Sequence, residues 1–87
     1  NSTFSGISIT PNPLKTSTSI QFGTSSHARV SIEVYDVCGK FIQVLTNKIY
    51  QPGIHSINWS PSLISPGVYF GRMKVNNTLE TFKLIVQ

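Results

Sequence analysis

The sequence predicts an all-β fold for a single small domain of 87 residues. Short runs of alternating apolar and polar residues recur about every 8–12 residues, and clusters of Gly, Pro, Asn and Ser separate them. No stretch longer than a turn combines a helical repeat of apolar residues with helix caps. Seven short strands in a chain of this length favour an antiparallel β-sandwich of the immunoglobulin-like type, which occupies about 100 residues.

The N-terminal part divides into a tail and a first strand. Residues 1–6 are mainly small and polar and are expected to form a linker tail, which leaves residues 7–87 for the domain. Alternation over residues 7–9 predicts a short strand. Pro11 and Pro13 end that strand, because proline fixes φ and has no amide hydrogen to donate.

The clearest strand is "ARVSIEVYDV" (28–37). Its even-numbered residues from Val30 to Val34 are apolar and point to one face, and the odd-numbered residues point to the other. The run "DVCGK" (36–40) then predicts a tight hairpin turn. We expect Gly39 to take a positive φ there, and the Asp36 carboxylate to accept hydrogen bonds from turn amides.

The remaining strands lie between further turn signals. "QPG" (51–53) and Asn76–Asn77 predict turns, and "SPSLISPG" (60–67) predicts a longer crossover in which Leu63 closes one end of the core. The strands expected around these connections are Thr18 to Phe22, Lys40 to Leu45, Ile54 to Trp59, Gly67 to Val75 and Leu79 to Val86.

A tyrosine near the start of the sixth strand suggests a specific corner. Gly67 ends the crossover, and Tyr69 follows it in the position of a tyrosine corner, whose hydroxyl bonds to backbone a few residues upstream. On this alternation Tyr69 and Met73 face inward with Gly71 between them. Since Gly71 has no side chain, a bulky neighbour such as Trp59 is expected to lie across it.

Charge and cysteine content argue against several function classes. Seven Lys and Arg against three Asp and Glu give a net charge of +4, and the basic residues are scattered without a run. A nucleic-acid interface gathers such residues among aromatics, so no nucleic-acid partner is expected. No apolar run approaches the length of a membrane span, so no membrane insertion is expected. Cys38, the only cysteine, has no partner for an internal disulfide.

Few side chains are available for catalysis, and they are His27, His55, Glu33, Asp36 and Glu80. Their spacing matches no nucleophilic triad, no facing pair of glycosidase carboxylates and no metal-ligand motif. A short chain also leaves little interior for an active-site cavity. We therefore predict that the domain is not an enzyme and uses no cofactor or metal. The His55 ring is expected to be partly buried, with one nitrogen hydrogen-bonded.

Three aromatic residues are expected on outward faces, namely Tyr35, Tyr50 and Phe70. Such residues suit either a platform on which sugars stack or a contact with a neighbouring domain. The second interpretation is favoured, because domain interfaces are enriched in exposed aromatics.

Four motifs, taken together and in this order, carry a family resemblance. They are "ITPNP" (9–13), "VYDVCGKFIQVL" (34–45), "GIHSINW" (53–59) and "LISPGVYFGRMKVNNTLETFKLIVQ" (63–87). The set resembles the C-terminal sorting domain of proteins exported by the type IX secretion system of Bacteroidetes-type bacteria. It is also similar to the immunoglobulin-like repeat of the flagellar hook-capping protein.

The resemblance to the sorting domain implies a role in export. The domain would be the C-terminal address of a larger cargo protein, usually a hydrolase or adhesin, delivered through the periplasm and outer membrane to the cell surface or medium. An outer-membrane translocon would recognise it, and a sortase-like peptidase would cut in or before residues 1–6. The positions that match the family motif are Pro11, Asn12, Pro13, Asp36, Gly39, Lys40, Gly67, Tyr69 and Lys83.

The residues themselves single out Lys83, since the last strand is expected to be an exposed sheet edge that a partner can read by strand addition. Two alternatives stay open. One is an accessory immunoglobulin-like module of an extracellular enzyme, structural or carbohydrate-binding. The other is a flagellar domain that self-assembles in a hook cap.

Overall fold

The computed structural model describes residues 4–61 and 64–87 and confirms the all-β prediction. The described residues contain no helix, and hence none long and apolar enough to cross a membrane. The seven strands are β1 (Phe4–Thr10), β2 (Thr18–Thr24), β3 (Ala28–Asp36), β4 (Phe41–Tyr50), β5 (Gly53–Trp59), β6 (Gly67–Val75) and β7 (Thr78–Val86).

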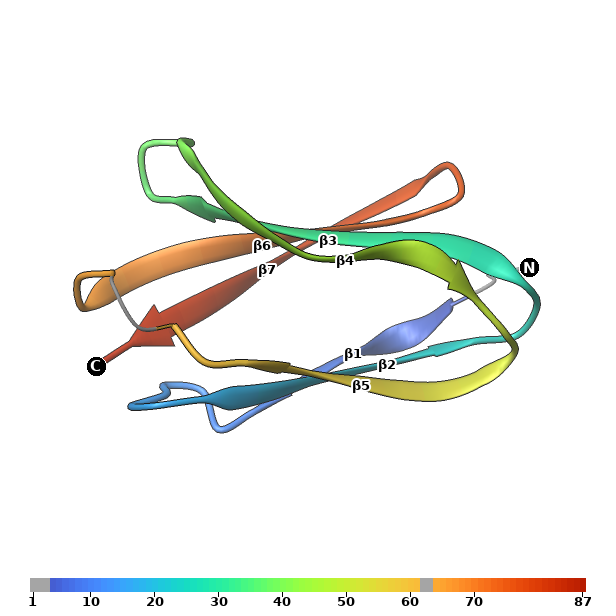
Figure 1. The fold of residues 1–87 in the computed structure, drawn as a ribbon, viewed down its shortest axis with the longest axis horizontal. Coiled ribbons are helices and arrows are strands. Elements are labelled where there is room, and N and C mark those ends of the chain that lie inside the picture. Colours follow the sequence, from blue (N-terminus) through green and yellow to red (C-terminus); the bar gives the residue numbers. More distant parts are fainter. Residues whose placement is uncertain (1–3, 62–63) are drawn as a thin grey trace.

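These strands form two antiparallel sheets. The three-stranded sheet has the order β1-β2-β5, and the four-stranded sheet has the order β4-β3-β6-β7. The sheets lie face to face as the two layers of a sandwich (Figure 1). The immunoglobulin-like sandwich predicted from the sequence is therefore confirmed.

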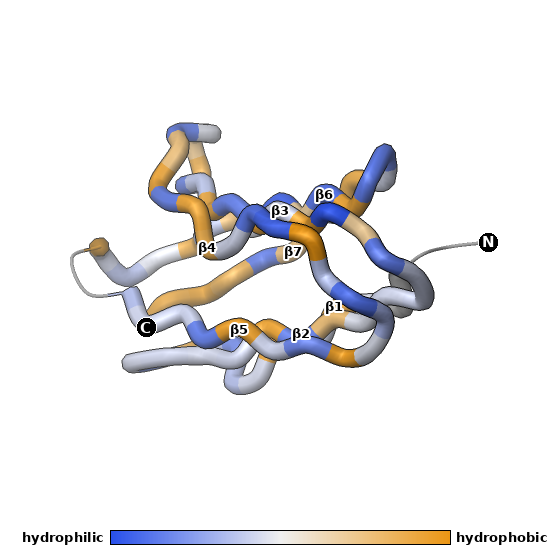
Figure 2. Tube along the Cα trace, turned by 45° about the vertical axis from the view of Figure 1, so that its right-hand side comes forward, coloured by the Kyte–Doolittle hydropathy of each residue, from blue (hydrophilic) through white to orange (hydrophobic). Residues whose placement is uncertain are grey.

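The core follows from the alternation along each strand. In β3 the side chains of Val30, Ile32 and Val34 are fully buried between the layers, while the intervening residues face outward. Hydrophobic and hydrophilic positions alternate in this way along the strands (Figure 2). The buried apolar side chains are Leu14, Ile20, Phe22, Ala28, Val30, Ile32, Val34, Tyr50, Trp59, Tyr69, Met73, Val75, Leu84 and Val86.

The first strand begins earlier than expected. β1 starts at Phe4, so residues 4–6 belong to a strand and not to the tail. Phe4 pairs with Thr24, and the register shifts before Ile7, where Gly6 has a φ of 115°. A bulge of this kind bends the strand locally, and glycine tolerates the positive φ.

The fourth strand is longer than expected, and this corrects the position of Tyr50. The polar run Thr46–Lys48 resembles a turn in sequence, but it continues β4 along the whole of β3. Tyr50, which was expected to face outward, is buried. Its ring contacts Phe22 edge-to-face at 5.2 Å, and its hydroxyl shares a 2.6 Å hydrogen bond with Thr46. The three-residue aromatic platform is therefore wrong.

Tyr69 and Met73 face the core as predicted, and Gly71 lies between them. The residue across Gly71 is not Trp59, however. The ring of Phe82, its partner on β7, covers Gly71 so closely that a Cβ would overlap it. Trp59 belongs to the other sheet and packs edge-to-face on Tyr69 at 6.4 Å. The expected position of Leu63 at the end of the core lies outside the described residues.

Candidate recognition site

The antiparallel topology brings the nine motif positions, which are separate in sequence, to one end of the sandwich. Residues 11–17, 36–40, 64–67 and 83–87 connect or end strands on the side where the C-terminus lies (Figure 1). We call this the motif end. β1 begins at the opposite end, where Phe4 pairs with Thr24.

Asn12 joins the first motif to the last one. Its side-chain Nδ2 donates a hydrogen bond to the carbonyl oxygen of Lys83 at 3.0 Å. Its Oδ1 accepts one from the amide of Ile85 at 3.1 Å. The amide side chain therefore satisfies one carbonyl and one N–H of the β7 edge, as a neighbouring strand does.

The backbone two residues later completes this contact. The amide of Leu14 donates to the carbonyl of Ile85, and the amide of Gln87 donates to the carbonyl of Leu14, both at 2.8 Å. Leu14 forms a parallel bridge with Val86 and is fully buried. We refer to residues 12–14 with residues 83–87 as the clasp.

The clasp modifies the prediction of an exposed last strand. β7 is an edge strand of the four-stranded sheet, as expected, but the clasp covers its C-terminal part. Alternate residues of an edge strand point their backbone N–H and C=O groups away from the sheet. On β7 the groups of this kind that the clasp leaves uncovered lie between Leu79 and the amide of Lys83. The Lys83 side chain is exposed.

The hairpin after β3 is built as predicted. Oδ1 of Asp36 accepts hydrogen bonds from the amides of Cys38 at 2.9 Å and Lys40 at 2.8 Å. Gly39 has a φ of 87°, a conformation that favours glycine. These two residues shape the turn, and the Lys40 side chain is left exposed.

The tyrosine corner is present at the start of β6. The Tyr69 hydroxyl donates a 2.6 Å hydrogen bond to the carbonyl of Ser65, four residues upstream. Gly67, between them, has a φ of 153°. Tyr69 is buried, so it stabilises the motif end and offers little surface to a partner.

Pro11, just before the clasp, and Pro13, within it, flank Asn12, and both are exposed. The carbonyl of Pro11 accepts a 2.7 Å hydrogen bond from the buried Thr18 hydroxyl, which fixes the segment to the start of β2. Among the nine motif residues, Lys40 and Lys83 are the ones that present charge to solvent.

One row of side chains crosses the outer face of the four-stranded sheet near the motif end. The strand registers place Phe41, Tyr35, Phe70 and Lys83 side by side on β4, β3, β6 and β7. The rings of Tyr35 and Phe41 meet edge-to-face at 5.8 Å. We call these four residues the aromatic row. The sequence alone did not predict it, because alternation gives the face of each residue but not the strand beside it.

Tyr35 is held by two neighbours in the next row. Its hydroxyl donates a 2.7 Å hydrogen bond to Oε1 of Glu33, and the Arg72 guanidinium lies 5.3 Å from its ring centroid. The hydrogen bond to Glu33 raises the pKa of the Tyr35 phenol, and desolvation and the Glu33 charge add to this, while Arg72 opposes it. Tyr35 therefore stays a neutral donor.

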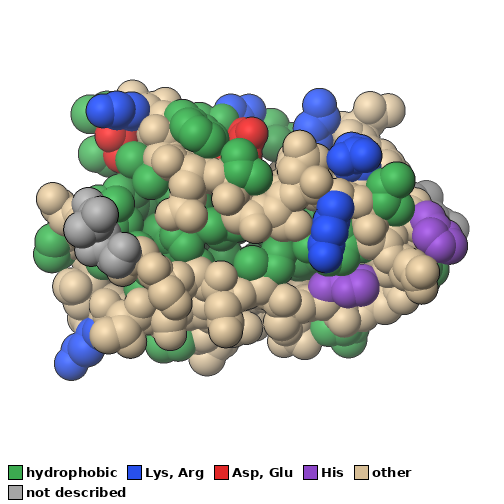
Figure 3. Space-filling model, viewed as in Figure 1, with side chains coloured by type: hydrophobic (Ala, Val, Ile, Leu, Met, Phe, Trp, Pro, Cys, Tyr) green, Lys and Arg blue, Asp and Glu red, His purple; other side chains and the backbone are tan. Residues whose placement is uncertain are grey.

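The structure also gathers cations that are scattered in the sequence. Arg29, Arg72, Lys74 and Lys83 all point to the outer face of the four-stranded sheet. Most of the Lys and Arg side chains visible in Figure 3 lie over this layer, the upper one in that view. Sequence reasoning missed this grouping because the four residues come from three different strands.

The candidate catalytic residues are not brought together. His55 is half-buried between Phe22 and Tyr50, and its Nε2 lies 2.8 Å from the carbonyl of Gln51, as expected for a packed ring. Across residues 4–61 and 64–87, no three His, Cys, Asp or Glu side chains are grouped so that they could hold a metal.

Fold and site together define a small immunoglobulin-like sandwich with nine motif positions at one end. The chain belongs to the family described as the secretion system C-terminal sorting domain, whose model matches residues 8–87. This is the sorting signal of the type IX secretion system, and the family is in general non-catalytic. Membership places the protein among those that are secreted or displayed at the cell surface.

A solved structure has the same fold. The chain is similar to part of dimeric latent PorU from Porphyromonas gingivalis, with 23% sequence identity and a TM-score of 0.73. The match covers 92% of this chain and 9% of that one. No curated protein sequence matches the chain.

Proposed function

We propose that the domain directs a larger cargo protein attached at its N-terminal side, such as an extracellular hydrolase, across the outer membrane. The translocon of the type IX system reads the motif end. The observation that supports this proposal is that the nine positions assigned to the family motif by sequence resemblance all lie at the end opposite to the start of β1. The cargo then extends from the end where β1 begins and leaves the motif end accessible.

Within the motif end, we assign recognition to the exposed charges and the aromatic row. Lys40 and Lys83 lie at the two sides of the sheet, with Phe41, Tyr35 and Phe70 between them. A central aromatic patch with cations at its rim is the composition of a protein interface that binds an acidic surface. The other motif residues hold this surface in shape.

The sortase-like peptidase of this proposal cuts on the N-terminal side of β1. Phe4 pairs with Thr24 and residues 4–6 lie within β1, so the backbone from Phe4 onward is a poor protease substrate. Cleavage ahead of Phe4 releases the cargo with the sandwich left whole.

Charge reversal at the motif end tests the proposal in a bacterium with a type IX system. The full-length cargo protein carries Lys40→Glu or Lys83→Glu, and each is expected to reduce surface delivery on the order of tenfold. Lys15→Glu, an exposed cation of the same end outside the motif, is the matched control and is expected to be delivered normally.

The readout is cargo at the cell surface relative to cargo in the periplasm, with cargo activity measured in lysates. Normal delivery of both motif variants, or an equal loss with Lys15→Glu, would contradict recognition through the motif positions. Retained activity in lysates separates a delivery defect from a misfolded cargo.

A further inference from the structure

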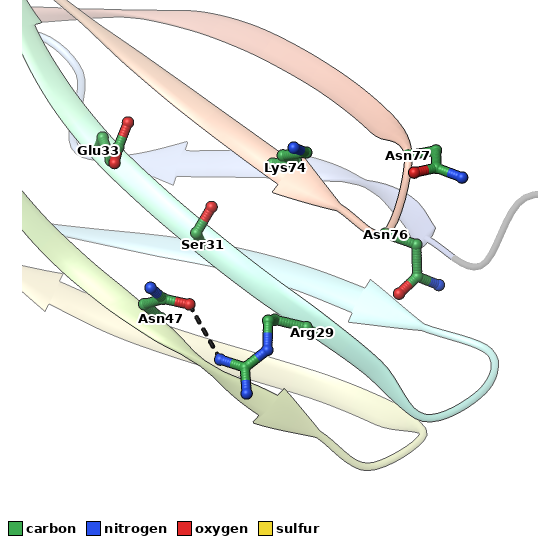
Figure 4. Close-up of a pocket in the computed structure, with 7 residues that line it drawn as sticks. All are labelled: Arg29, Ser31, Glu33, Asn47, Lys74, Asn76 and Asn77. Carbon is green, nitrogen blue, oxygen red and sulfur yellow. Dashed lines mark hydrogen bonds between the residues drawn. The ribbon is translucent and has the colours of Figure 1, made fainter.

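A polar pocket lies on the outer face of the four-stranded sheet, at the end away from the motif end. Its volume is about 510 Å³. Side chains from β3, β4, β6 and the β6–β7 turn surround it (Figure 4). The lining residues are Arg29, Ser31, Glu33, Asn47, Lys74, Asn76 and Asn77.

The strand register explains why the sheet is hollow here. Ser31 pairs with Asn47 on β4 and with Lys74 on β6, so a short side chain lies between two longer ones. Along β3 its neighbours on the same face are Arg29 and Glu33, which are also longer. Ser31 is therefore the floor of the pocket, and its four neighbours are the walls.

Hydrogen bonds between lining residues fix the walls. Nη1 of Arg29 donates a 3.2 Å hydrogen bond to Oδ1 of Asn47, which orients the guanidinium (Figure 4). The amide of Asn76 donates to the carbonyl of Arg29 at 3.3 Å, and Asn76 has a φ of 53° in its turn. Among residues 4–61 and 64–87 the Arg29 guanidinium uses one of its five N–H donors, the one bonded to Asn47, so the others can bind a ligand.

The charges of the pocket favour an anion. Arg29 and Lys74 are the two cations of the walls, and Glu33 is the acid. The Glu33 carboxylate accepts the Tyr35 hydroxyl and has Arg72 as its cross-strand neighbour. The pocket therefore holds two cations against one carboxylate that already accepts a hydrogen bond, and its net charge is positive.

We propose that this pocket binds an acidic sugar, namely a hexuronic acid residue of an anionic polysaccharide. The planar Arg29 fork matches the sugar carboxylate, and Lys74 adds a second positive charge. The Ser31 hydroxyl and the amides of Asn47 and Asn76 both donate and accept, as sugar hydroxyls require.

Apolar side chains flank the pocket on the outer face of the sheet, one on β4 and one on β7. Ile49 on β4 is the cross-strand neighbour of Arg29, and Leu79 on β7 is that of Lys74. They are 60% and 51% exposed, so they are available to the C–H faces of a pyranose ring. An acidic peptide would need the charges but not a hydroxyl-lined hollow, so a sugar is favoured.

The experiment measures binding of trigalacturonic acid to the 87-residue chain by calorimetry and by amide chemical-shift mapping. Maltotriose is the neutral sugar control, and hexaglutamate is the acidic peptide control. Trigalacturonic acid is expected to bind, with shifts confined to β3, the second half of β4 and the β6–β7 hairpin. Binding should weaken as salt is raised.

Variants locate the site. Arg29→Gln and Lys74→Gln are each expected to weaken binding about tenfold or more, and Ser31→Leu, which fills the hollow, to abolish it. Lys15→Gln removes one exposed charge at the motif end and is expected to leave binding within about twofold. Thermal unfolding checks that each variant folds.

Equal binding of maltotriose, equal or tighter binding of hexaglutamate, or unchanged affinity in the three pocket variants would overturn the proposal. The result is independent of sorting, since none of these residues belongs to the motif end. Lys83→Glu is expected to bind trigalacturonic acid like the parent chain.

Discussion

Asn12 and Lys83 are 71 residues apart in sequence, and Nδ2 of Asn12 donates a 3.0 Å hydrogen bond to the Lys83 carbonyl. The other end of the same amide accepts from Ile85. One side chain thus joins the segment after β1 to the edge of β7, which belongs to the other sheet. This contact is the basis of the first prediction.

Asn12→Ala removes both hydrogen bonds of the clasp. We expect the free energy of unfolding to fall by about 1–2 kcal/mol, because each net hydrogen bond contributes roughly 0.5–1.5 kcal/mol. Urea denaturation followed by circular dichroism measures this. Asn58→Ala, at an exposed position of β5, is the matched control and should stay within about 0.5 kcal/mol of the parent chain.

Tyr69→Phe tests the tyrosine corner. The substitution keeps the ring on Trp59 but removes the 2.6 Å hydrogen bond to the Ser65 carbonyl, and we expect a loss of about 1–2 kcal/mol in unfolding free energy. Tyr35→Phe also deletes one hydroxyl with one hydrogen bond, but on the outer face of the sheet. It should cost clearly less, and equal losses in both variants would contradict a special role for the corner.

The close packing of Phe82 on Gly71 predicts that a larger residue at position 71 destabilises the fold and that a smaller one at position 82 compensates for it. Gly71→Ala places a methyl group against the ring, so we expect a loss of about 1–3 kcal/mol. Phe82→Leu provides space for that methyl group. In a double-mutant cycle, the loss of unfolding free energy in the double variant should therefore be smaller than the sum of the losses in the two single variants. Simple additivity would argue against a direct clash.

The turn after β3 depends on an acceptor at residue 36 more than on its charge. Asp36→Ala removes the acceptor for the amides of Cys38 and Lys40, and we expect a loss of about 1–2 kcal/mol. Asp36→Asn keeps an oxygen at that place and should recover most of the loss. Both are measured by thermal and urea unfolding, and equal damage from the two substitutions would show that the charge is what matters.

The raised pKa of Tyr35 predicts how its contribution to stability changes with pH. Its pKa is raised above the ordinary value of 10.0 in the folded chain, so its contribution to stability is complete below pH 10.0 and is lost as pH rises through the folded pKa. NMR titration of the tyrosine ring resonances should show Tyr35 ionising later than a free tyrosine. Glu33→Gln removes the charged acceptor and should lower the pKa of Tyr35; an unchanged midpoint would contradict the assigned cause.

The fold was predictable because its information is local. The alternation from Val30 to Val34, the positive φ of Gly39 and the Asn76 turn each depend on a few consecutive residues. The inward orientation of Tyr69 follows from the same alternation.

The features missed from the sequence depend on which strands become neighbours. Tyr50 was expected to face outward, and its burial follows from the continuation of β4 along β3, which the expected strand from Lys40 to Leu45 did not include. Phe82 reaches Gly71, and Asn12 reaches Lys83, through pairings that the residue pattern does not specify. The aromatic row and the polar pocket combine residues of three or four strands, so only the assembled sheet reveals them.

The clasp has a consequence for biosynthesis. Residues 83–87 leave the ribosome after every strand of the three-stranded sheet has been made, and until then Asn12 and Leu14 have no partner at the β7 edge. A nascent chain that stops short of Lys83 lacks the clasp and the last part of the motif end, whatever the state of the cargo ahead of it. Synthesis of residues 83–87 is thus a precondition for this surface, and a product terminated before Lys83 does not carry it.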